Sequence, residues 1–199
     1  MIPLAINAAN LVLGPATLYV APFGTAEPLD SALTPNGVST PPGGSWVDVG
    51  GTDGGVTAEV DNTYTDLNVD QVLMGVGARL TGVSIKVTAK LSEMTLNNIN
   101  QVLNSISSIS QGTGYASMDV PVGSAATQPS YAALLIDGWA PMLGTGAPAR
   151  RRLIVRKVLS QTKVTMAFDK KTQQALDCSW SAYFVSGSIA PMHIADQQA

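Results

Sequence analysis

Few side chains in this chain of 199 residues have the chemistry of a catalytic or metal-binding centre. His193 is the only histidine and Cys178 the only cysteine. A Ser-His-Asp or Cys-His arrangement would depend on His193, which we expect to lie in a frayed C-terminal tail. A zinc site needs several Cys or His ligands, and these two residues do not make one. The sequence therefore predicts no catalytic residue, no metal and no cofactor, and we expect that the protein is not an enzyme.

Two other local patterns also favour structure over chemistry. Cys178 alternates with Leu176 and Trp180, which is typical of a buried, inert core thiol. The run GGTDGG at 50–55 lacks the Lys-Ser/Thr of a phosphate-binding loop and no helical pattern follows it. This run predicts a flexible turn. The aspartates around it match no calcium-loop spacing, so turn caps and solvated faces explain them better.

Acidic and basic residues are separated along the chain. Residues 1–78 contain eight acidic residues and no lysine or arginine, whereas residues 79–199 contain all 11 basic residues and six acidic ones. The formal charge is therefore −8 in the first part and +5 in the second. A chain of this kind can complement itself, either internally or between copies.

Five of the 11 basic residues gather in one short segment, 150–157. Aromatic residues for stacking and a recognition helix are absent nearby, so an acidic protein surface is at least as good a partner as DNA. We expect the acidic segment 46–70 of one subunit to approach this basic segment of another, with pairing inside one chain as the alternative. The inter-subunit candidates are Asp48, Asp53, Asp66, Asp70, Arg150, Arg151, Arg152, Arg156 and Lys157.

The composition is unusually poor in charge. Only 13% of the residues are charged, 45% are hydrophobic and the mean hydropathy is +0.19. An ordinary soluble domain has about 25% charged residues. The composition excludes disorder as the main state and predicts that much of the monomer's surface is covered in the finished object. There is no run of 18 apolar residues, so we expect no transmembrane helix and no membrane partner.

Alternation of apolar and polar residues predicts a mainly β chain. The clearest strand pattern is GVSIKVTAKL at 82–91. In two later strands the inward faces would include Met166 and Phe168, and then Phe184. The other expected strands are 15–21, 46–49, 55–61, 131–137, 152–159, 163–168 and 175–184.

One amphipathic helix is expected at 95–106, buried through Leu96, Ile99 and Leu103, with Ile106 on the same stripe. Its polar face has five amides and no charge. That face either packs against another subunit or is solvated.

The chain is expected to form a single domain, 1–199, with three irregular parts. These are an N-terminal arm (about 1–14), a long loop (about 22–45) and a C-terminal tail (about 187–199). The Pro/Gly-rich loop 22–45 is too long for a hairpin turn, so we expect an arm or flap that contacts a neighbouring subunit.

The ordered set of elements resembles the major tail tube proteins of long-tailed (siphovirus-type) bacteriophages. The resemblance covers roughly residues 14–190. It begins with a short strand and a Pro/Gly-rich loop, followed by WVDVG at 46–50 and a Gly-rich turn into the strand GVTAEV. The long strand 82–91 then leads through Leu-Ser-Glu to the Asn-rich helix. A basic strand, the segment KVTMAF, a Lys/Gln turn at 170–174 and a last strand complete the pattern. The low charge and the Gly/Ser-rich segment 107–130 depart from it.

The resemblance implies a mainly β fold: an antiparallel β-sandwich or partial barrel with one packed α-helix (about 95–106) and long loops. It also implies a structural virion protein whose hexameric rings stack head to tail into the hollow tail tube. The implied partners are further copies, the tape-measure protein, the tail terminator and distal tail proteins, and genomic DNA that passes without specific binding. The implied location is the virion tail, assembled in the host cytoplasm. The alternatives are another tube or shell protein (a secretion-system tube or capsid decoration) and a carbohydrate-binding β-sandwich.

A tube that conducts a genome must not hold it, because each Lys or Arg contact to phosphate adds affinity. We therefore expect Glu59 and Asp61 to face the lumen. Lys86 and Lys90 are expected to pair with acids or to turn towards a neighbouring subunit.

Overall fold

The structure is a computed structural model that describes residues 7–33, 42–121, 128–143, 148–171 and 173–198. Strands make up 47% and helices 8% of it. The fold is mainly antiparallel β with one α-helix, and the sheet does not close into a barrel. The predicted fold class is confirmed. Parts of the expected N-terminal arm, long loop, segment 107–130 and C-terminal tail lie outside the described residues.

The elements follow one another along the chain with short and long connections. The helices are η1 (Ala8–Asn10), η2 (Asp30–Ala32) and α1 (Leu96–Val102). The strands are β1 (Thr17–Pro22), β2 (Val47–Asp48), β3 (Thr52–Leu67), β4 (Gly77–Leu91), β5 (Ile109–Gly112), β6 (Tyr115–Met118), β7 (Ala132–Ala140), β8 (Ala149–Ser160), β9 (Leu176–Ala182) and β10 (Met192–Asp196).

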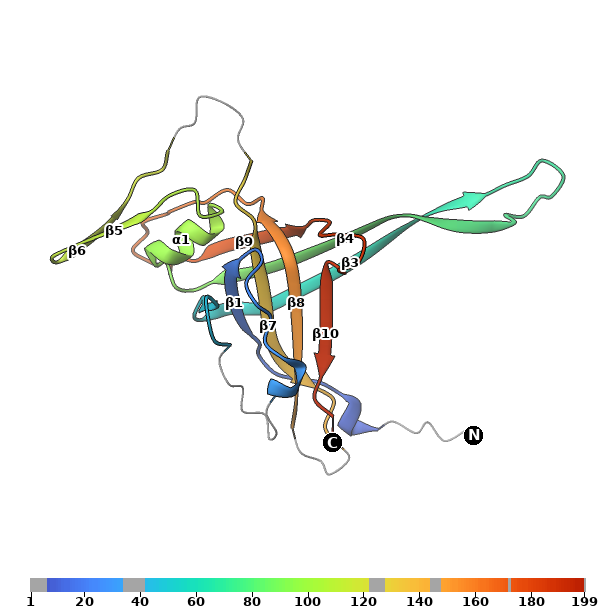
Figure 1. Cartoon of the computed structure of the whole chain (residues 1–199), viewed down its shortest axis with the longest axis horizontal. Coiled ribbons are helices and arrows are strands. Elements are labelled where there is room, and N and C mark those ends of the chain that lie inside the picture. Colours follow the sequence, from blue (N-terminus) through green and yellow to red (C-terminus); the bar gives the residue numbers. More distant parts are fainter. Residues whose placement is uncertain (1–6, 34–41, 122–127, 144–147, 172, 199) are drawn as a thin grey trace.

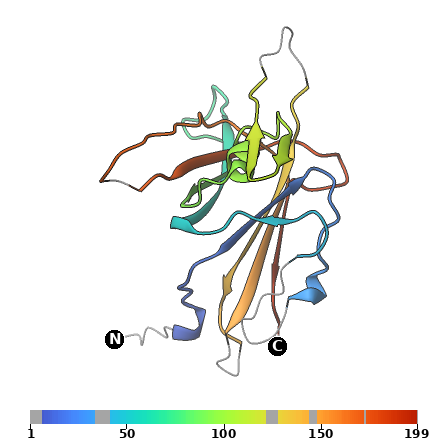
Figure 2. The same cartoon turned by 90° about the vertical axis from the view of Figure 1, so that its left-hand side faces the viewer.

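The main sheet has eight strands in the order β2-β1-β7-β8-β9-β4-β3, with β10 also paired to β8. Strand β8 makes this branch, because one of its edges pairs with β10 over 151–155 and with β9 over 158–160. The strands β9, β4 and β3 therefore cross the direction of β1, β7 and β8 (Figures 1 and 2). The main core has side chains from both groups of strands, among them Leu18, Leu134, Val155, Val87 and Trp180.

Helix α1 packs on this core through Ile99 and Val102. Thr95 caps it, because its side-chain oxygen accepts a hydrogen bond from the Asn98 backbone N–H at 3.1 Å. The helix ends at Val102, four residues before the predicted end. Asn104 and Ser105 take positive φ values of 60° and 52°, a left-handed conformation that cannot continue the helix.

The amides of this segment bind the protein's own backbone. Asn98 is buried and its Nδ2 donates to the carbonyls of Val49 and Glu93, both at 2.8 Å. Asn104 exchanges two hydrogen bonds with the backbone of Ser160. These side chains satisfy backbone groups that would otherwise be buried without partners. They hold the helix segment to Val49 just after β2, to the end of β8 and to the loop before the helix.

Residues 163–168 do not form the predicted strand. Phe168 is 90% exposed and Met166 is 54% exposed. Strand β9 ends at Ala182, so Phe184 lies outside it and is exposed. Alternation is not sufficient here: β8 pairs with β9 only over 158–160, and the chain that follows does not continue this pairing.

The C-terminal segment contains a strand instead of the expected frayed tail. Residues 192–196 form β10, which pairs with β8 from Met192↔Val155 to Asp196↔Arg151. These five residues show no clear alternation, so the sequence did not predict a strand here. The strand forms because its backbone pairs with the free edge of β8.

The glycine run at 50–55 is the entry to β3 and not a separate turn. Gly54 and Gly55 have φ values of 78° and 84°, and the pairing with β4 shifts register between Thr52 and Val56. Glycine tolerates this backbone, which inserts an irregularity at the start of a long strand.

Candidate functional site: surfaces for assembly

The most exposed feature of the molecule is the hairpin formed by β3 and β4. The two strands pair from Val56↔Ala89 outwards to Leu67↔Gly77. Only the inner part also pairs with β9, over residues 86–91 of β4. The outer part leaves the body of the molecule as a two-stranded arm (Figure 1). Such an arm is marginally stable in water unless something packs on it.

One face of this arm continues the core face of the sheet. Val87 and Ile85 are buried in the core on β4, 1% and 7% exposed. The same face then runs outwards along both strands, because cross-strand partners share a face. We call its exposed part the hairpin stripe: Val60, Tyr64, Leu80 and Val83, which are 51–59% exposed.

The end of the arm is also apolar. Leu73 is fully exposed and Met74 is 79% exposed. We define the hairpin tip as residues 67–76, with exposed Leu67, Val69, Val72, Leu73, Met74 and Val76. The stripe and tip together hold ten of the 25 large apolar side chains that are exposed in the described part of the chain. A concentration of this kind marks an interaction surface.

The opposite face of the arm is polar and contains the two lumen candidates. Glu59 lies across from Lys86, and Asp61 lies across from Ser84. Lys90 forms an ion pair with Asp53 at 2.5 Å, which confirms that this lysine pairs with an acid. Whether Glu59 and Asp61 face a lumen stays a prediction.

Two arginines of the basic segment are buried in the fold. Arg150 Nη2 lies 3.0 Å from Asp137 Oδ1, and Arg152 Nη2 lies 3.8 Å from Asp137 Oδ2. Asp137 and Arg152 are cross-strand partners on β7 and β8, and both are only 1% exposed. These two arginines pair within the chain, but their partner lies outside the acidic segment 46–70, so neither expected pairing of the two segments describes them.

The other basic side chains also contact their own chain. Arg151 binds Asp196 through both carboxylate oxygens, at 2.6 and 2.7 Å, which holds the pKa of Asp196 below its ordinary value. Arg156 binds Glu27 in the same two-pronged way, at 2.5 and 2.9 Å.

The remaining inter-subunit candidates lie in more open places. Lys157 Nζ lies over the ring of Tyr131 at 4.4 Å and over that of Phe23 at 5.5 Å. Asp48 accepts a hydrogen bond from the Gly50 N–H. Asp66 and Asp70 are exposed, on the arm and at its tip. A contact between these carboxylates and Lys157 or Arg156 of another copy stays a prediction.

The described part of the long loop lies on its own sheet. We call residues 23–33 the strap. Glu27 binds Arg156, the Leu29 carbonyl accepts from Arg152 at 3.4 Å, and Asp30 contacts His193 Nε2 at 3.0 Å. Trp46 Nε1 also donates to the Ala26 carbonyl at 3.0 Å. This part of the loop is fastened to its own sheet, and a contact with a neighbouring subunit stays a prediction. Residues 34–41 lie outside the described residues.

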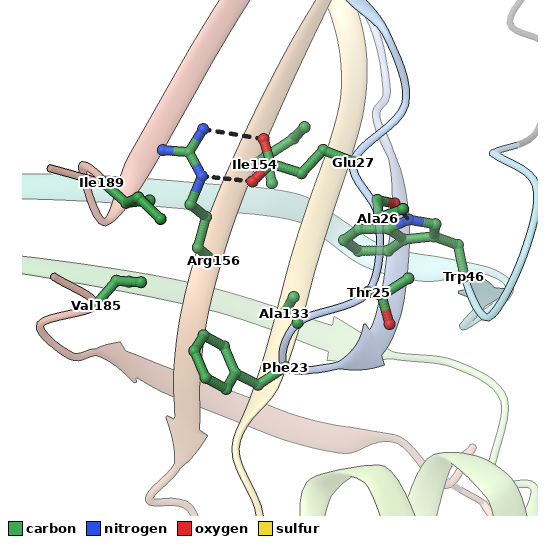
Figure 3. Close-up of a pocket in the computed structure, with 11 residues that line it drawn as sticks. Phe23, Thr25, Ala26, Glu27, Trp46, Ala133, Ile154, Arg156, Val185 and Ile189 are labelled. Carbon is green, nitrogen blue, oxygen red and sulfur yellow. Dashed lines mark hydrogen bonds and ion pairs between the residues drawn. The ribbon is translucent and has the colours of Figure 1, made fainter.

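The strap forms one side of an apolar pocket of about 390 Å³. Trp46, Ala133 and Ile154 are buried beneath it. Val185 and Ile189 lie on one side and Trp46 on the other, with Phe23 at the lower edge and the Glu27–Arg156 ion pair at the upper edge (Figure 3). The lining of the pocket is therefore mainly apolar, and one neutralised charge pair lies at its edge.

The residues that the sequence singled out for possible chemistry show no reactive or metal-binding arrangement in the described part of the chain. Cys178 is buried, as predicted, and burial raises the pKa of its thiol to about 12. In the described ranges, no group of three or more His, Cys, Asp or Glu side chains is placed to hold a metal ion. No helix in those ranges is long and apolar enough to cross a membrane.

Sequence reasoning missed the arm, because it found two strands at 55–61 and 82–91 and left the residues between them unassigned. The signal was present in the apolar residues that recur from Tyr64 to Leu80. A scan of protein-family models and a search of curated proteins found no match to this chain.

Proposed function

We propose that this protein is a structural subunit that polymerises into a tube of the kind formed by phage tail tube proteins. The observation that carries the proposal is the hairpin stripe. A core-facing row of side chains continues past the edge of the body and is left uncovered on the arm. A second copy that packs on this row would complete the burial that the fold begins.

The composition supports the same proposal. A monomer with 13% charged residues and an apolar arm is poorly suited to remain alone in water. The mainly antiparallel fold with one helix is also the fold that the resemblance implies. In this proposal six copies form a ring, and rings stack into a tube around the tape-measure protein. Terminator and distal tail proteins close the ends, and the tube belongs to the virion tail.

The polar face of the arm would then line the lumen. When the stripe packs on a neighbour, the face with Glu59 and Asp61 is the one left to solvent. Acidic side chains repel the phosphate backbone, so the genome would glide along this wall. The variant Glu59→Lys with Asp61→Lys should slow DNA ejection, and ejection at the normal rate would contradict this assignment.

Electron microscopy of the purified protein tests the proposal. We expect rings or tubes for the unmodified chain and a dispersed monomer for the stripe variant Tyr64→Ser with Leu80→Ser. The matched control is Met166→Ser with Phe168→Ser, which removes two exposed apolar side chains from the loop after β8. The control should assemble like the unmodified chain.

The outcomes separate the proposed function from its alternatives. A monomer at all concentrations argues against any polymer and leaves a binding module as the better explanation. Closed shells or rings that never stack indicate capsid decoration or another ring protein. Tubes from the stripe variant would show that the arm is not the contact.

A further inference from the structure

The pocket beneath the strap is prepared to accept an apolar group. Its floor is made by Trp46, Ala133 and Ile154, which are held by the sheet. Its rim is fixed by the two-pronged Glu27–Arg156 pair, and Arg156 also donates to the Ala190 carbonyl at 2.6 Å. These bonds order both sides of the opening before anything binds, which lowers the entropic cost of binding.

The size and lining of the pocket define its occupant. A cavity of about 150 Å³ lined by aliphatic and aromatic side chains holds a benzene ring. The pocket of about 390 Å³ has room for more than one aliphatic side chain. Half-exposed Phe23 and Ile189 on its edge would be covered by the same group.

The chain itself contains a group of this kind in the hairpin tip. Leu73 and Met74 are the two most exposed large apolar side chains of the arm. The tip stands at the far end of the arm, away from β7 and β8 (Figure 1). The tip therefore cannot reach the pocket of its own copy. It is free to reach the pocket of another.

Charge favours the same match. Residues 59–78 contain four acidic residues and no lysine or arginine. Next to the pocket, Lys157 lies over Phe23, one of the lining residues, and Arg156 forms the rim. Because Glu27 neutralises Arg156, the basic group at the edge is Lys157, and an acidic, apolar tip thus meets an apolar pocket with one lysine beside it, which favours and orients the encounter.

We propose that the pocket lined by Phe23, Trp46 and Ile189 receives the hairpin tip of a second copy, with Asp70 of the tip close to Lys157 of the receiving copy. This inference rests on the proposed function, since it names the receiving surface of the same assembly. The tip and the pocket are different surfaces, so the contact is head to tail and repeats from copy to copy.

The test uses two variants that each lose one half of the contact. The tip variant is Leu73→Asp with Met74→Asp, and the pocket variant is Phe23→Ser with Ile189→Glu. All four side chains are exposed or half-exposed, so we expect both chains to fold. Each variant alone should bind its own copies at least about tenfold more weakly than the unmodified chain.

An equimolar mixture of the two variants should form a 1:1 heterodimer. The intact tip of the pocket variant enters the intact pocket of the tip variant, and no further tip–pocket contact is left for growth. Sedimentation velocity measures this directly. A mixture with the control Met166→Asp and Phe168→Asp in place of either variant should grow beyond the dimer.

A double-mutant cycle tests the proposed contact between Asp70 and Lys157. Lys157→Glu should weaken association, and Asp70→Lys in the partner copy should restore it. Restoration would identify the two residues as neighbours, whereas additive losses would contradict the proposed orientation.

The failures are distinguishable. If the tip variant stays monomeric but the pocket variant assembles like the unmodified chain, the pocket is not the receiver and the proposed function stands. If the unmodified chain is monomeric, the proposed function itself fails. If the mixture stays monomeric while the dye anilinonaphthalene sulfonate fills the pocket of the tip variant, the pocket serves a small apolar ligand and the inference is overturned.

Discussion

Strand β8 and the β3–β4 hairpin use their side chains in opposite ways. On β8, Arg150 and Arg152 lie inside the protein against the buried carboxylate of Asp137. On the hairpin, Tyr64 and Leu80 lie in water. The protein therefore buries charged side chains in the body of the sheet and exposes apolar side chains on the hairpin that extends from it.

This difference indicates that β8 contributes to folding and the hairpin to assembly. Buried ion pairs that are lost from one side leave an uncompensated charge, so β8 is a region on which the fold depends. The stripe residues are more than half exposed in the single chain, so the fold depends on them much less. Variants of the two regions should therefore change different quantities, the free energy of unfolding and the free energy of assembly.

The largest expected effect is on β8. Asp137→Asn keeps the shape of the side chain but leaves two buried guanidinium groups without their carboxylate. We expect a loss of about 3–5 kcal/mol in the free energy of unfolding, measured in urea melts at a concentration where the protein is monomeric. Asp66→Asn makes the same chemical change on the arm and should alter that free energy by less than about 0.5 kcal/mol. Equal losses in the two variants would remove the distinction between the regions.

A second pair of variants tests the distinction within one strand. Val87 and Val83 share a face of β4, but Val87 is 1% exposed and Val83 is 55% exposed. Val87→Ala should cost about 1.5–3 kcal/mol of folding stability because it empties part of the core. Val83→Ala should leave folding almost unchanged and raise the concentration needed for assembly. The idea of an uncovered core face fails if Val83→Ala assembles like the unmodified chain.

How much the sequence predicts follows the same division. The alternation in 82–91 predicts a strand and its buried face, because burial and period coincide where β4 crosses the core. Outside the body β4 extends back to Gly77. No core covers this part of the strand, so its sequence alternates less strictly between apolar and polar residues. The helix and the burial of Ile99 are predicted correctly, but Leu96 and Leu103 are only half-buried and Ile106 is exposed. The early end of the helix depends on the left-handed backbone at Asn104.

Pairing partners were harder to predict than elements. The segregation of charge along the chain indicates complementarity, and it leaves open which acids meet which bases. The structure pairs the arginines with Glu27, Asp137 and Asp196, none of which lies in the segment 46–70. These contacts depend on the order of strands in the sheet and on the strap, and neither is encoded in local spacing.

The smallest expected effect is the pH dependence of the Arg151–Asp196 pair, which lies beside the Asp137 cluster at the start of β8. The pKa of Asp196 is lowered from its ordinary value of 3.8, first by its hydrogen bonds to Arg151. A carboxyl whose pKa is lower in the folded state stabilises the fold above the ordinary value, and this contribution is lost as the pH falls through the folded value. Both side chains are partly exposed, so the gain should stay within about 1 kcal/mol.

The variant Asp196→Asn measures this contribution. At pH 7 it should unfold slightly more easily than the unmodified chain, and the difference should shrink as the pH is lowered below 3.8, where the unmodified carboxyl also loses its charge. Hydrogen exchange should show faster opening of β10 alone, since Asp196 fastens that strand to Arg151. A difference that persists undiminished at low pH would assign the effect to packing. In that case the charge of the Arg151–Asp196 pair would contribute nothing to folding stability. The evidence that charge pairs on β8 stabilise the fold would then come from Asp137→Asn alone.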